Sequence, residues 1–252
     1  MKNLFTIHLL IFVFFFISCS KDDNKVEPEP EKPAGTGTLQ TDIVGKWMVS
    51  SISGRTTADG AFLEFMADST YIIYNITEDI AIGKYVSDSD KSAKLQGFGE
   101  ITGISLSQDK ITCTLTSSAG RKFTIAAAKA QEIGTDDRTR LLARNWALTS
   151  EEDGGLLLTS DSDPTVKFDI DFTFSASGTY LVTYKFQGQI DPGVKGNWKW
   201  HSTAQDRIVY WLDGEQINEN QNMLVRTLTA DLLKLTDKND IGDFNMTLKP
   251  SK

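Results

Sequence analysis

The chain has 252 residues, a formal net charge of −8, two cysteines and two histidines. An acidic chain with evenly mixed charges lacks the basic patches that nucleic acid requires, so we expect no nucleic-acid partner. The small number of histidines excludes a histidine-rich metal centre, and we expect neither a metal nor any other cofactor.

The N-terminus has the features of an export signal. Lys2 supplies a positive charge, and residues 9–17 are all apolar. This run is too short to cross a bilayer, which takes about 20 apolar residues, but it suits a signal peptide over residues 1–18. Phe16-Ile17-Ser18-Cys19 resembles a bacterial lipobox. The resemblance implies that Cys19 carries a lipid anchor; the alternative is an ordinary cleaved signal in which Cys19 is incidental.

The residues after Cys19 concern the location of the protein. Ser20-Lys21-Asp22-Asp23-Asn24 is similar to the acidic export signal of Bacteroidetes surface lipoproteins. This implies anchoring in the outer membrane facing the cell exterior, with the periplasmic face as the alternative. Residues 19–38 are polar and hold three of the six prolines, which predicts a disordered tether after the lipid.

The rest of the chain contains two similar halves. The order of matching segments predicts one domain over 39–134 and a second over 135–252. The matched pairs are Ile43–Trp47 with Leu142–Trp146, Phe65–Tyr71 with Phe174–Tyr180, Gly83–Tyr85 with Gly196–Trp198, and Lys110-Ile111 with Arg207-Ile208.

The residue pattern of both halves indicates β-strands. Tyr180, Val182, Tyr184 and Phe186 alternate with other residues and should share one buried face. Cys113 occupies the apolar phase of residues 110–116, which favours a buried, inert thiol and leaves no disulfide. Short helices are expected before each tryptophan strand, over Leu39–Val44 and over Asp136–Ala143, the latter capped by Thr135 or Asp136.

The motifs in these halves resemble those of lipocalins. Gly45-Lys46-Trp47 resembles the G-x-W signature, and Gly196, Trp198 and Trp200 resemble the later aromatic strand of lipocalin-like domains in Bacteroidetes lipoproteins. The resemblance implies an all-β chain with two small antiparallel up-and-down β-barrels in tandem. It also implies that Trp47 and Trp146 pack across the barrel ends in a structural role.

Candidate ligand-binding residues come from the aromatic side chains of the second half. Trp198, Trp200, Tyr210 and Trp211 fall on two neighbouring strands. Tyr210 and Trp211 must point in opposite directions, so an exposed ring here could stack on a sugar or an apolar ligand. The alternative is that these rings build the core.

No catalytic residue is assigned from the sequence. His201 is the one histidine outside the signal, and nothing near it in sequence suggests a nucleophile arrangement. Carboxylates are numerous, but no pair stands out for glycoside hydrolysis. The segment 237–243 is not an EF-hand because Ile241 stands where Asp or Asn is needed; a looser calcium site there or at Asp161–Asp163 remains open.

These observations favour a non-enzymatic lipoprotein that acts as a binding or accessory module. Its partners would be the membrane, through Cys19, and a small apolar molecule, a glycan or an outer-membrane protein. The alternatives are a glycan-acting hydrolase with a carboxylate pair and a purely structural envelope protein. An open apolar barrel would favour the small molecule, and an exposed tryptophan platform the glycan.

Overall fold

The computed structural model describes residues 39–53, 59–77, 80–151, 168–186, 189–239 and 242–251. They belong to one compact unit that spans Ala34–Lys252. The predicted signal peptide, Cys19, the whole predicted tether of residues 19–38 and the Asp161–Asp163 segment lie outside the described residues. Of the helices in the described ranges, none has the length and apolar character needed to cross a bilayer.

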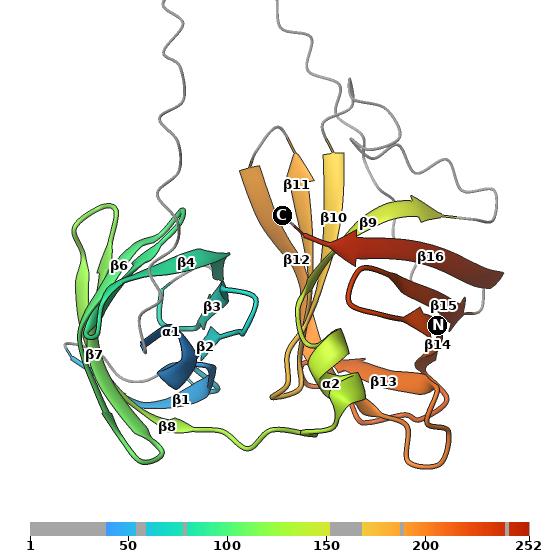
Figure 1. Ribbon diagram of the computed structural model, residues 1–252, viewed down its shortest axis with the longest axis horizontal. Helices are drawn as coiled ribbons and strands as arrows, with labels where there is room; N and C mark the ends of the chain where they lie inside the picture. The colour runs from blue at the N-terminus through green and yellow to red at the C-terminus, as the bar shows by residue number, and fades with distance from the viewer. Residues whose placement is uncertain are drawn as a thin grey trace, which may run out of the picture. The chain divides into compact units, whose positions relative to one another are not determined.

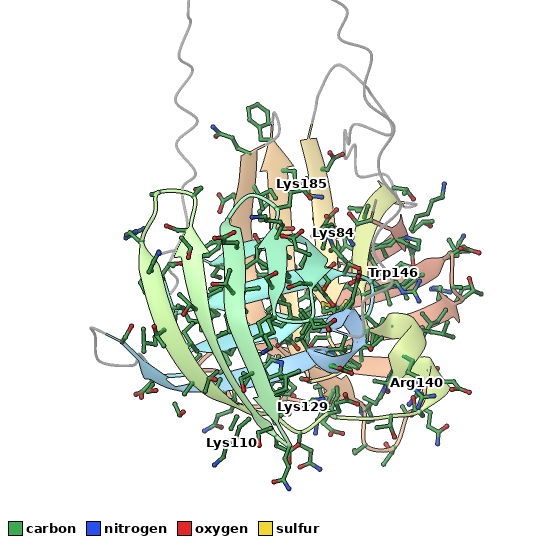
Figure 2. All side chains as sticks on the ribbon, turned by 60° about the vertical axis from the view of Figure 1, so that its left-hand side comes forward. Lys84, Lys110, Lys129, Arg140, Trp146 and Lys185 are labelled. Carbon is green, nitrogen blue, oxygen red and sulfur yellow. The ribbon has the colours of Figure 1, made fainter. Side chains whose placement is uncertain are left out.

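Two closed antiparallel barrels follow one another along the chain (Figure 1). In the first barrel each strand pairs with the next in sequence, and the last strand pairs with the first. Its strands are β1 (Gly45–Ile52), β2 (Phe62–Phe65), β3 (Thr70–Tyr74), β4 (Ala81–Ser89), β5 (Ser92–Leu95), β6 (Gly99–Ser107), β7 (Lys110–Ser117) and β8 (Lys122–Lys129). Lys110 and Lys129 lie at the same end of this barrel (Figure 2).

The second barrel repeats this order and closes by pairing its last strand with its first. Closure leaves no unpaired sheet edge. The predicted all-β fold, with two small antiparallel barrels in tandem, is therefore confirmed. The strands are β9 (Asn145–Glu151), β10 (Phe168–Phe174), β11 (Thr179–Phe186), β12 (Gln189–Trp200), β13 (Arg207–Leu212), β14 (Asn222–Leu228), β15 (Leu233–Asn239) and β16 (Gly242–Pro250).

A short helix precedes each barrel. These helices are α1 (Leu39–Asp42) and α2 (Asp137–Leu142). Asp136 caps α2, and its carboxylate accepts a hydrogen bond from the Thr139 amide at 2.6 Å. This bond satisfies an amide that has no partner within the helix. The two helices lie where the sequence predicts them.

The tryptophan that follows each helix is buried in the same way. Trp47 and Trp146 are 1 % and 0 % exposed. The Trp47 indole nitrogen donates to the Ile43 carbonyl at 2.8 Å, and the Trp146 indole nitrogen donates to the Leu142 carbonyl at 2.9 Å. In both cases the acceptor lies four residues earlier, at the end of the helix. The two side chains therefore have like surroundings in the two barrels.

The strand register makes the two barrels comparable residue by residue. Thr70 and Tyr71 pair with Lys84 and Gly83, while Thr179 and Tyr180 pair with Asn197 and Gly196. A Cβ atom at Gly83 would meet the Gln96 carbonyl oxygen at 2.5 Å, and one at Gly196 would meet the Trp211 carbonyl oxygen at 2.3 Å. Both glycines are needed because the next strand passes directly against them.

The glycine of the G-x-W segment is needed in the first barrel alone. Gly45 has a φ of +133°, which L side chains rarely adopt. Its counterpart in the second barrel is Arg144, which is not among the described non-glycine residues with positive φ. The second barrel therefore enters its first strand with an ordinary backbone, and an arginine is tolerated there.

One predicted match between the halves is wrong. Lys110-Ile111 begins β7, the seventh strand of its barrel, whereas Arg207-Ile208 begins β13, the fifth strand of the other. The register instead makes Ile111 equivalent to Leu233 of β15. Ile111 pairs with Ala127 and Leu233 pairs with Leu248, and these two partners occupy equivalent places in the last strands of the two barrels. A basic residue followed by an aliphatic one recurs in amphipathic strands, so this pattern cannot identify a strand.

Alternation along the strands fills the barrel interiors. Cys113 is 3 % exposed on β7. Burial raises the pKa of its thiol to about 12, so the inert thiol expected from the sequence is what the core contains. Tyr180, Val182 and Tyr184 face the second core as predicted. Phe186 shares their phase but is 55 % exposed, because β11 ends there, beyond the packed layer.

We predict that Trp47→Ala and Trp146→Ala each lower the free energy of unfolding by about 3–5 kcal/mol, since each change leaves a cavity and frees a helix-end carbonyl. Urea unfolding followed by circular dichroism would measure the loss. Val86→Ala, at a side chain that is 45 % exposed, is the control and should change stability by less than about 0.5 kcal/mol. A loss below about 1 kcal/mol at either tryptophan would contradict the shared structural role.

Candidate functional site

The four aromatic residues predicted to bind a ligand do not form one surface. Trp198 is 0 % exposed, and its indole nitrogen donates to the Ser175 carbonyl at 2.9 Å. Its ring packs edge-to-face on Trp200, with ring centres 5.5 Å apart. Tyr210 packs against the same core, and strand alternation turns Trp211 to the outer face. Trp198 thus serves the core, the alternative that the sequence left open.

Trp200 is tied to the helix that begins the second barrel. Its indole nitrogen donates to the Thr139 hydroxyl at 2.9 Å, and the Arg138 guanidinium lies 3.7 Å from its ring centre. A guanidinium at this distance from the ring makes a cation–π contact. The ring is partly buried and joins α2 to the base of the barrel.

His201 stabilises a turn after β12. Its Nδ1 atom accepts hydrogen bonds from the amides of Thr203 and Ala204, both at 3.1 Å, and its Nε2 atom lies 3.5 Å from Glu219. Hydrogen bonds from Lys199 and Ser202 lower the pKa of Glu219 to about 2. The Thr203 hydroxyl lies 3.4 Å from the same Nδ1 atom, so the imidazole holds the residues of this turn together.

The segment 237–243, which the sequence left open as a loose calcium site, contributes residues to two strands. Asp237 belongs to β15, and β16 begins at Gly242. Among the residues that the structure describes, no group of three or more histidine, cysteine, aspartate or glutamate side chains could hold a metal ion.

The interior of the second barrel differs from that of the first at two facing positions. The register places Tyr210 where the first barrel has Leu95, and Asp237 where it has Leu115. Leu95 and Leu115 are 2 % and 0 % exposed, and they complete a packed apolar core. In the second barrel the Tyr210 hydroxyl instead donates to the Asp237 carboxylate, 3.2 Å from each oxygen.

This pair sits in an aromatic environment that favours neutral groups. Burial raises the pKa of Asp237, while the hydrogen bond from Tyr210 acts in the opposite direction. Burial also raises the pKa of Tyr210 to about 12, so its hydroxyl remains a donor at neutral pH. The Tyr180 ring lies 5.5 Å from the Tyr210 ring and is nearly fully buried.

The barrel end opposite Trp146 is lined by aromatic side chains. Phe186 and Phe244 are 55 % and 37 % exposed there. A hollow of about 470 Å³ lies at the end of the β11–β12 hairpin. The interior-facing residues of this barrel that remain partly exposed are mostly large, namely Phe172, Tyr184, Val194, Trp200, Tyr210, Val225 and Leu228. Those of the first barrel are fewer and include one aromatic residue, namely Val49, Ala81, Leu106 and Phe123.

The two barrels contact each other through equivalent strands. Phe62, Ile72 and Leu181 form a buried apolar cluster, and the register makes Ile72 and Leu181 equivalent. Equivalent residues that meet across an interface define a two-fold relation, as in an isologous dimer. The two barrels thus pack about an approximate internal two-fold axis near this pair.

Two buried ionisable side chains of opposite sign lie in this interface. Lys46 and Glu64 are directly paired on β1 and β2 and are 9 % and 1 % exposed. The Lys46 ammonium donates to the Thr179 hydroxyl of the second barrel at 3.0 Å. Burial lowers the pKa of Lys46, while the carboxylate of Glu64 raises it. For Glu64 the same burial raises the pKa, because it also disfavours the charged form, while Lys46 and hydrogen bonds from Ser175 and Thr179 lower it.

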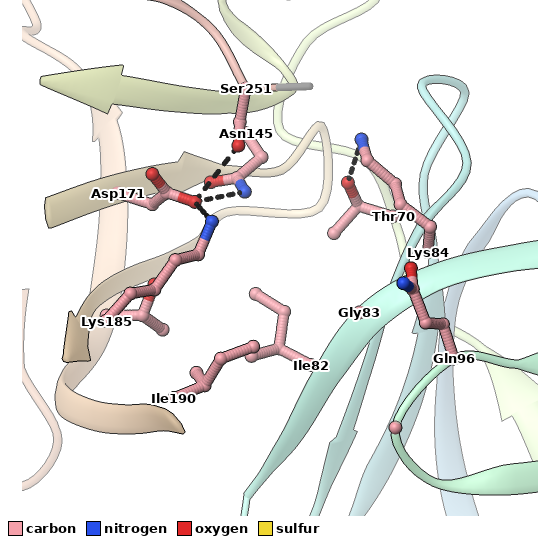
Figure 3. A pocket seen from close by; sticks show the side chains of 12 residues that line it. Thr70, Ile82, Gly83, Lys84, Gln96, Asn145, Asp171, Lys185, Ile190 and Ser251 are labelled. Atoms are coloured by element: carbon pink, nitrogen blue, oxygen red, sulfur yellow. Dashed lines mark hydrogen bonds and ion pairs between the residues drawn. The ribbon is translucent and has the colours of Figure 1, made fainter. Parts of the chain in front are cut away.

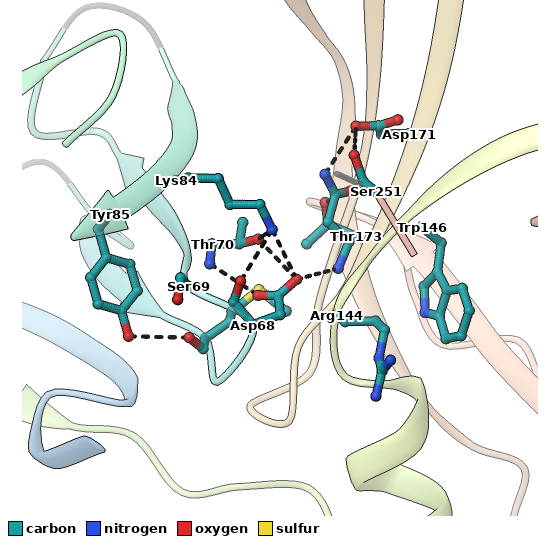
Figure 4. A network of polar contacts seen from close by, with 12 residues as sticks. Asp68, Ser69, Thr70, Lys84, Tyr85, Arg144, Trp146, Asp171, Thr173 and Ser251 are labelled. Atoms are coloured by element: carbon teal, nitrogen blue, oxygen red, sulfur yellow. Dashed lines mark hydrogen bonds and ion pairs between the residues drawn. The ribbon is translucent and has the colours of Figure 1, made fainter. Parts of the chain in front are cut away.

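A second polar network joins the barrels around Asp68 (Figure 4). Its carboxylate accepts hydrogen bonds from the backbone amide of Asn145 at 3.0 Å and from the Thr70 hydroxyl at 3.0 Å. The Lys84 ammonium lies 3.4 Å from the same carboxylate and donates to the Thr70 hydroxyl at 3.1 Å. The turn before β3 is thereby fixed to the first strand of the second barrel.

Beside this network lies a cleft of about 340 Å³ between the barrels (Figure 3). Lys84 of β4 and Lys185 of β11 line opposite sides of it (Figure 2, Figure 3). Asp171 lies in its wall with a side chain that is 1 % exposed. Nothing in the sequence pointed to this cleft, because its lining residues come from eight separate segments of the chain.

Comparisons with known proteins add little to this geometry. No family model matches the sequence, and no curated protein matches it. The chain is similar to the crystal structure of a protein with unknown function from the DUF3598 family of Nostoc punctiforme, with 13 % identity and a TM-score of 0.21. That match covers 84 % of this chain and 97 % of the other.

We predict that Lys46→Met alone lowers the free energy of unfolding by about 3–5 kcal/mol, because it leaves the Glu64 carboxylate buried without its cation. The double variant Lys46→Met/Glu64→Gln should recover most of this loss, because no buried charge remains. Urea unfolding of both variants near neutral pH measures the difference. A double variant as unstable as the single one would show that lost packing, not the unpaired charge, sets the cost.

The single variant should also gain a pH dependence. Without Lys46 the folded-state pKa of Glu64 rises further above its unfolded value. The stabilisation from a raised carboxyl pKa is complete below the unfolded pKa and is lost as pH rises through the folded pKa. Lys46→Met should therefore lose stability relative to the parent chain as the pH rises from about 4, the usual pKa of an unfolded glutamate, towards neutral. A difference that stays constant over this range would contradict the assignment.

Proposed function

We propose that this protein is a lipid-anchored envelope lipoprotein that binds a small, largely apolar molecule inside its second barrel, without catalysing a reaction. The lipid-anchor motif at Cys19 and the polar tether support the anchoring. The divergence between the two barrel interiors supports the binding.

The Tyr210–Asp237 pair is the observation on which the binding proposal depends. The first barrel fills the same positions with Leu95 and Leu115 and packs them completely. Replacing two buried leucines by a tyrosine and an aspartate loses apolar burial and desolvates a carboxylate. Such a loss of stability is typical of binding sites, where residues are selected for a ligand instead of for packing.

The chemistry of the pair indicates what the ligand carries. Asp237 receives hydrogen bonds from Tyr210, and no basic side chain is among the described groups that shift its pKa. A ligand with an amine or hydroxyl donor would complete the carboxylate's hydrogen bonds. The rings of Tyr180 and Tyr210 would contact the apolar body of the ligand.

Binding accounts for the site better than hydrolysis does. A glycoside hydrolase needs two carboxyl groups about 5–10 Å apart across one cleft. In the described surroundings of Asp237, the groups that shift its pKa do not include a second carboxylate. We therefore keep the carboxylate-pair hydrolase as the less supported alternative.

The location is proposed from the sequence alone. The acidic segment Ser20–Asn24 resembles the export signal of Bacteroidetes surface lipoproteins, and it favours display on the outer face of the outer membrane. The tether of residues 19–38 would hold the folded unit away from the membrane.

The ligand-binding proposal is tested with the neutral probe N-phenyl-1-naphthylamine, which has an apolar body and one N–H donor and fluoresces in apolar surroundings. We expect saturable binding to the mature chain. Asp237→Asn and Tyr210→Phe should each weaken it about tenfold, because a hydrogen bond to a buried charged group is worth roughly 1.5–3 kcal/mol.

The control is Tyr85→Phe, which removes a hydroxyl from the first barrel and should leave the affinity within about twofold. Equal weakening by all three variants, or no saturable binding by the parent chain, would contradict the proposal. Native mass spectrometry of protein purified from its own cells would then identify a retained ligand by its added mass.

The anchoring proposal is tested by Cys19→Ser, which should move the protein from the membrane fraction to the soluble fraction. Replacing Lys21-Asp22-Asp23 with alanines should keep it in the membrane but protect it from protease added to intact cells. Membrane association that survives Cys19→Ser would show that Cys19 is not the anchor.

A further inference from the structure

The approximate two-fold axis generates two related clefts between the barrels. Five lining positions of the cleft beside Asp171 are equivalent to five of a second cleft beside Asp213. We call them the Asp171 cleft and the Asp213 cleft. In each pair below, the first residue lines the Asp171 cleft and the second lines the Asp213 cleft. The pairs are Asn145 with Lys46, Asp171 with Phe62, Thr183 with Tyr74, Ile82 with Lys195, and Lys84 with Asn197.

The polar side chains that line the Asp213 cleft are paired with one another. The Lys195 ammonium lies 4.1 Å from the centre of the Tyr74 ring and forms an ion pair with Asp213. Asn197 donates to the same carboxylate at 3.1 Å, and the Tyr74 hydroxyl donates to it at 3.3 Å. The polar groups of this cleft therefore bond to each other and cover its aromatic rings.

The Asp171 cleft is more enclosed and has a different chemistry. One oxygen of Asp171 accepts from Lys185 at 2.5 Å, from Asn145 at 2.9 Å and from Ser251 at 3.1 Å. Three donors thus saturate this oxygen, and the other oxygen has no partner among the described residues. A buried carboxylate held in this way fixes the Lys185 side chain against the wall of the cleft.

The two lysines of the cleft differ in how many ammonium donors their protein partners use. Lys185 is 30 % exposed, and the ion pair with Asp171 uses one of its three ammonium donors. Lys84 is also 30 % exposed, but its three donors bond to the Asp68 carbonyl at 3.1 Å, the Asp68 carboxylate at 3.4 Å and the Thr70 hydroxyl at 3.1 Å. Lys185 is more accessible than the Asp171 carboxylate, which is 1 % exposed, and this favours an anionic ligand beside Lys185.

The remaining lining residues suit a hydroxylated molecule. Thr70 and Gln96 supply polar groups on the side of the first barrel, and Ile82 and Ile190 supply a small apolar surface. The volume of about 340 Å³ lies at the lower end of the roughly 300–1,000 Å³ of small-molecule sites.

We propose that the Asp171 cleft binds a small hydroxylated carboxylate, the chemistry of a sugar acid, through Lys185. This site is separate from the interior of the second barrel. Its ligand contacts both barrels, so binding stabilises their mutual packing.

The test is isothermal titration of the mature chain with D-glucuronate and with D-glucose, which lacks the carboxylate. We expect glucuronate to bind at least about tenfold more tightly, because charge-assisted hydrogen bonds are roughly twice as strong as neutral ones. Methyl β-D-glucuronide is a third arm: binding equal to that of the free acid identifies the end of an acidic glycan, and its failure to bind identifies the free acid.

Substitutions place the binding in the cleft. Lys185→Gln should weaken glucuronate binding about tenfold, and Ile82→Trp, which fills the cleft without removing a charge, should abolish it. The matched control is Lys195→Gln, which breaks the ion pair of the Asp213 cleft and should change the affinity less than twofold. Thermal unfolding of each variant separates loss of binding from loss of folding.

Three results would overturn the proposal: equal binding of glucose and glucuronate, glucuronate binding that survives Ile82→Trp, or no binding of either sugar. Asp237→Asn should leave glucuronate binding unchanged, so a failure at this cleft can be distinguished from a failure of the site in the second barrel.

Discussion

The hydrogen bond from an indole nitrogen to a helix-end carbonyl is the interaction on which each barrel depends. A closed barrel of eight short strands needs a large side chain to fill its base, and the tryptophan ring does this. Burying an indole N–H requires an acceptor, and the end of a helix has carbonyls without partners. The short helix before the first strand therefore supplies the acceptor at Ile43 in one barrel and Leu142 in the other.

The likeness of the two barrels accounts for the interface between them. Two copies with the same outer strands can pack about a two-fold axis, as identical subunits do. Once the copies share one chain, equivalent positions are free to differ. Lys46 and Glu64 became a buried charged pair, while their counterparts Asn145 and Thr173 bond to each other at 2.9 Å. The two clefts that flank the axis differ in the same way: Lys195 pairs with Asp213 in one, and Lys84 and Lys185 line the other.

The same divergence separates the interiors. The first barrel retains leucines at positions 95 and 115 and is packed as a structural core. The second replaces them with Tyr210 and Asp237 and keeps large aromatic side chains partly exposed. The first barrel thus contributes stability, and the second barrel can carry residues such as Tyr210 and Asp237 that selection for stability alone would not favour. This division explains why a chain without disulfides holds a desolvated carboxylate inside a small barrel.

The sequence by itself determined the elements whose signals are local. Alternating residues indicated the strands, Thr135 or Asp136 indicated the start of α2, and the paired tryptophan and Thr-Tyr segments indicated two similar β-domains. Strand equivalence beyond these segments required the tertiary structure, because a basic–aliphatic pair such as Lys110-Ile111 fits several strands. The structure also decided that Trp198 belongs to the core and that Tyr210 meets Asp237. Side chains on β13 and β15 meet only when the barrel closes, and the Asp171 cleft forms only when two barrels pack together, so no short-range pattern encodes either.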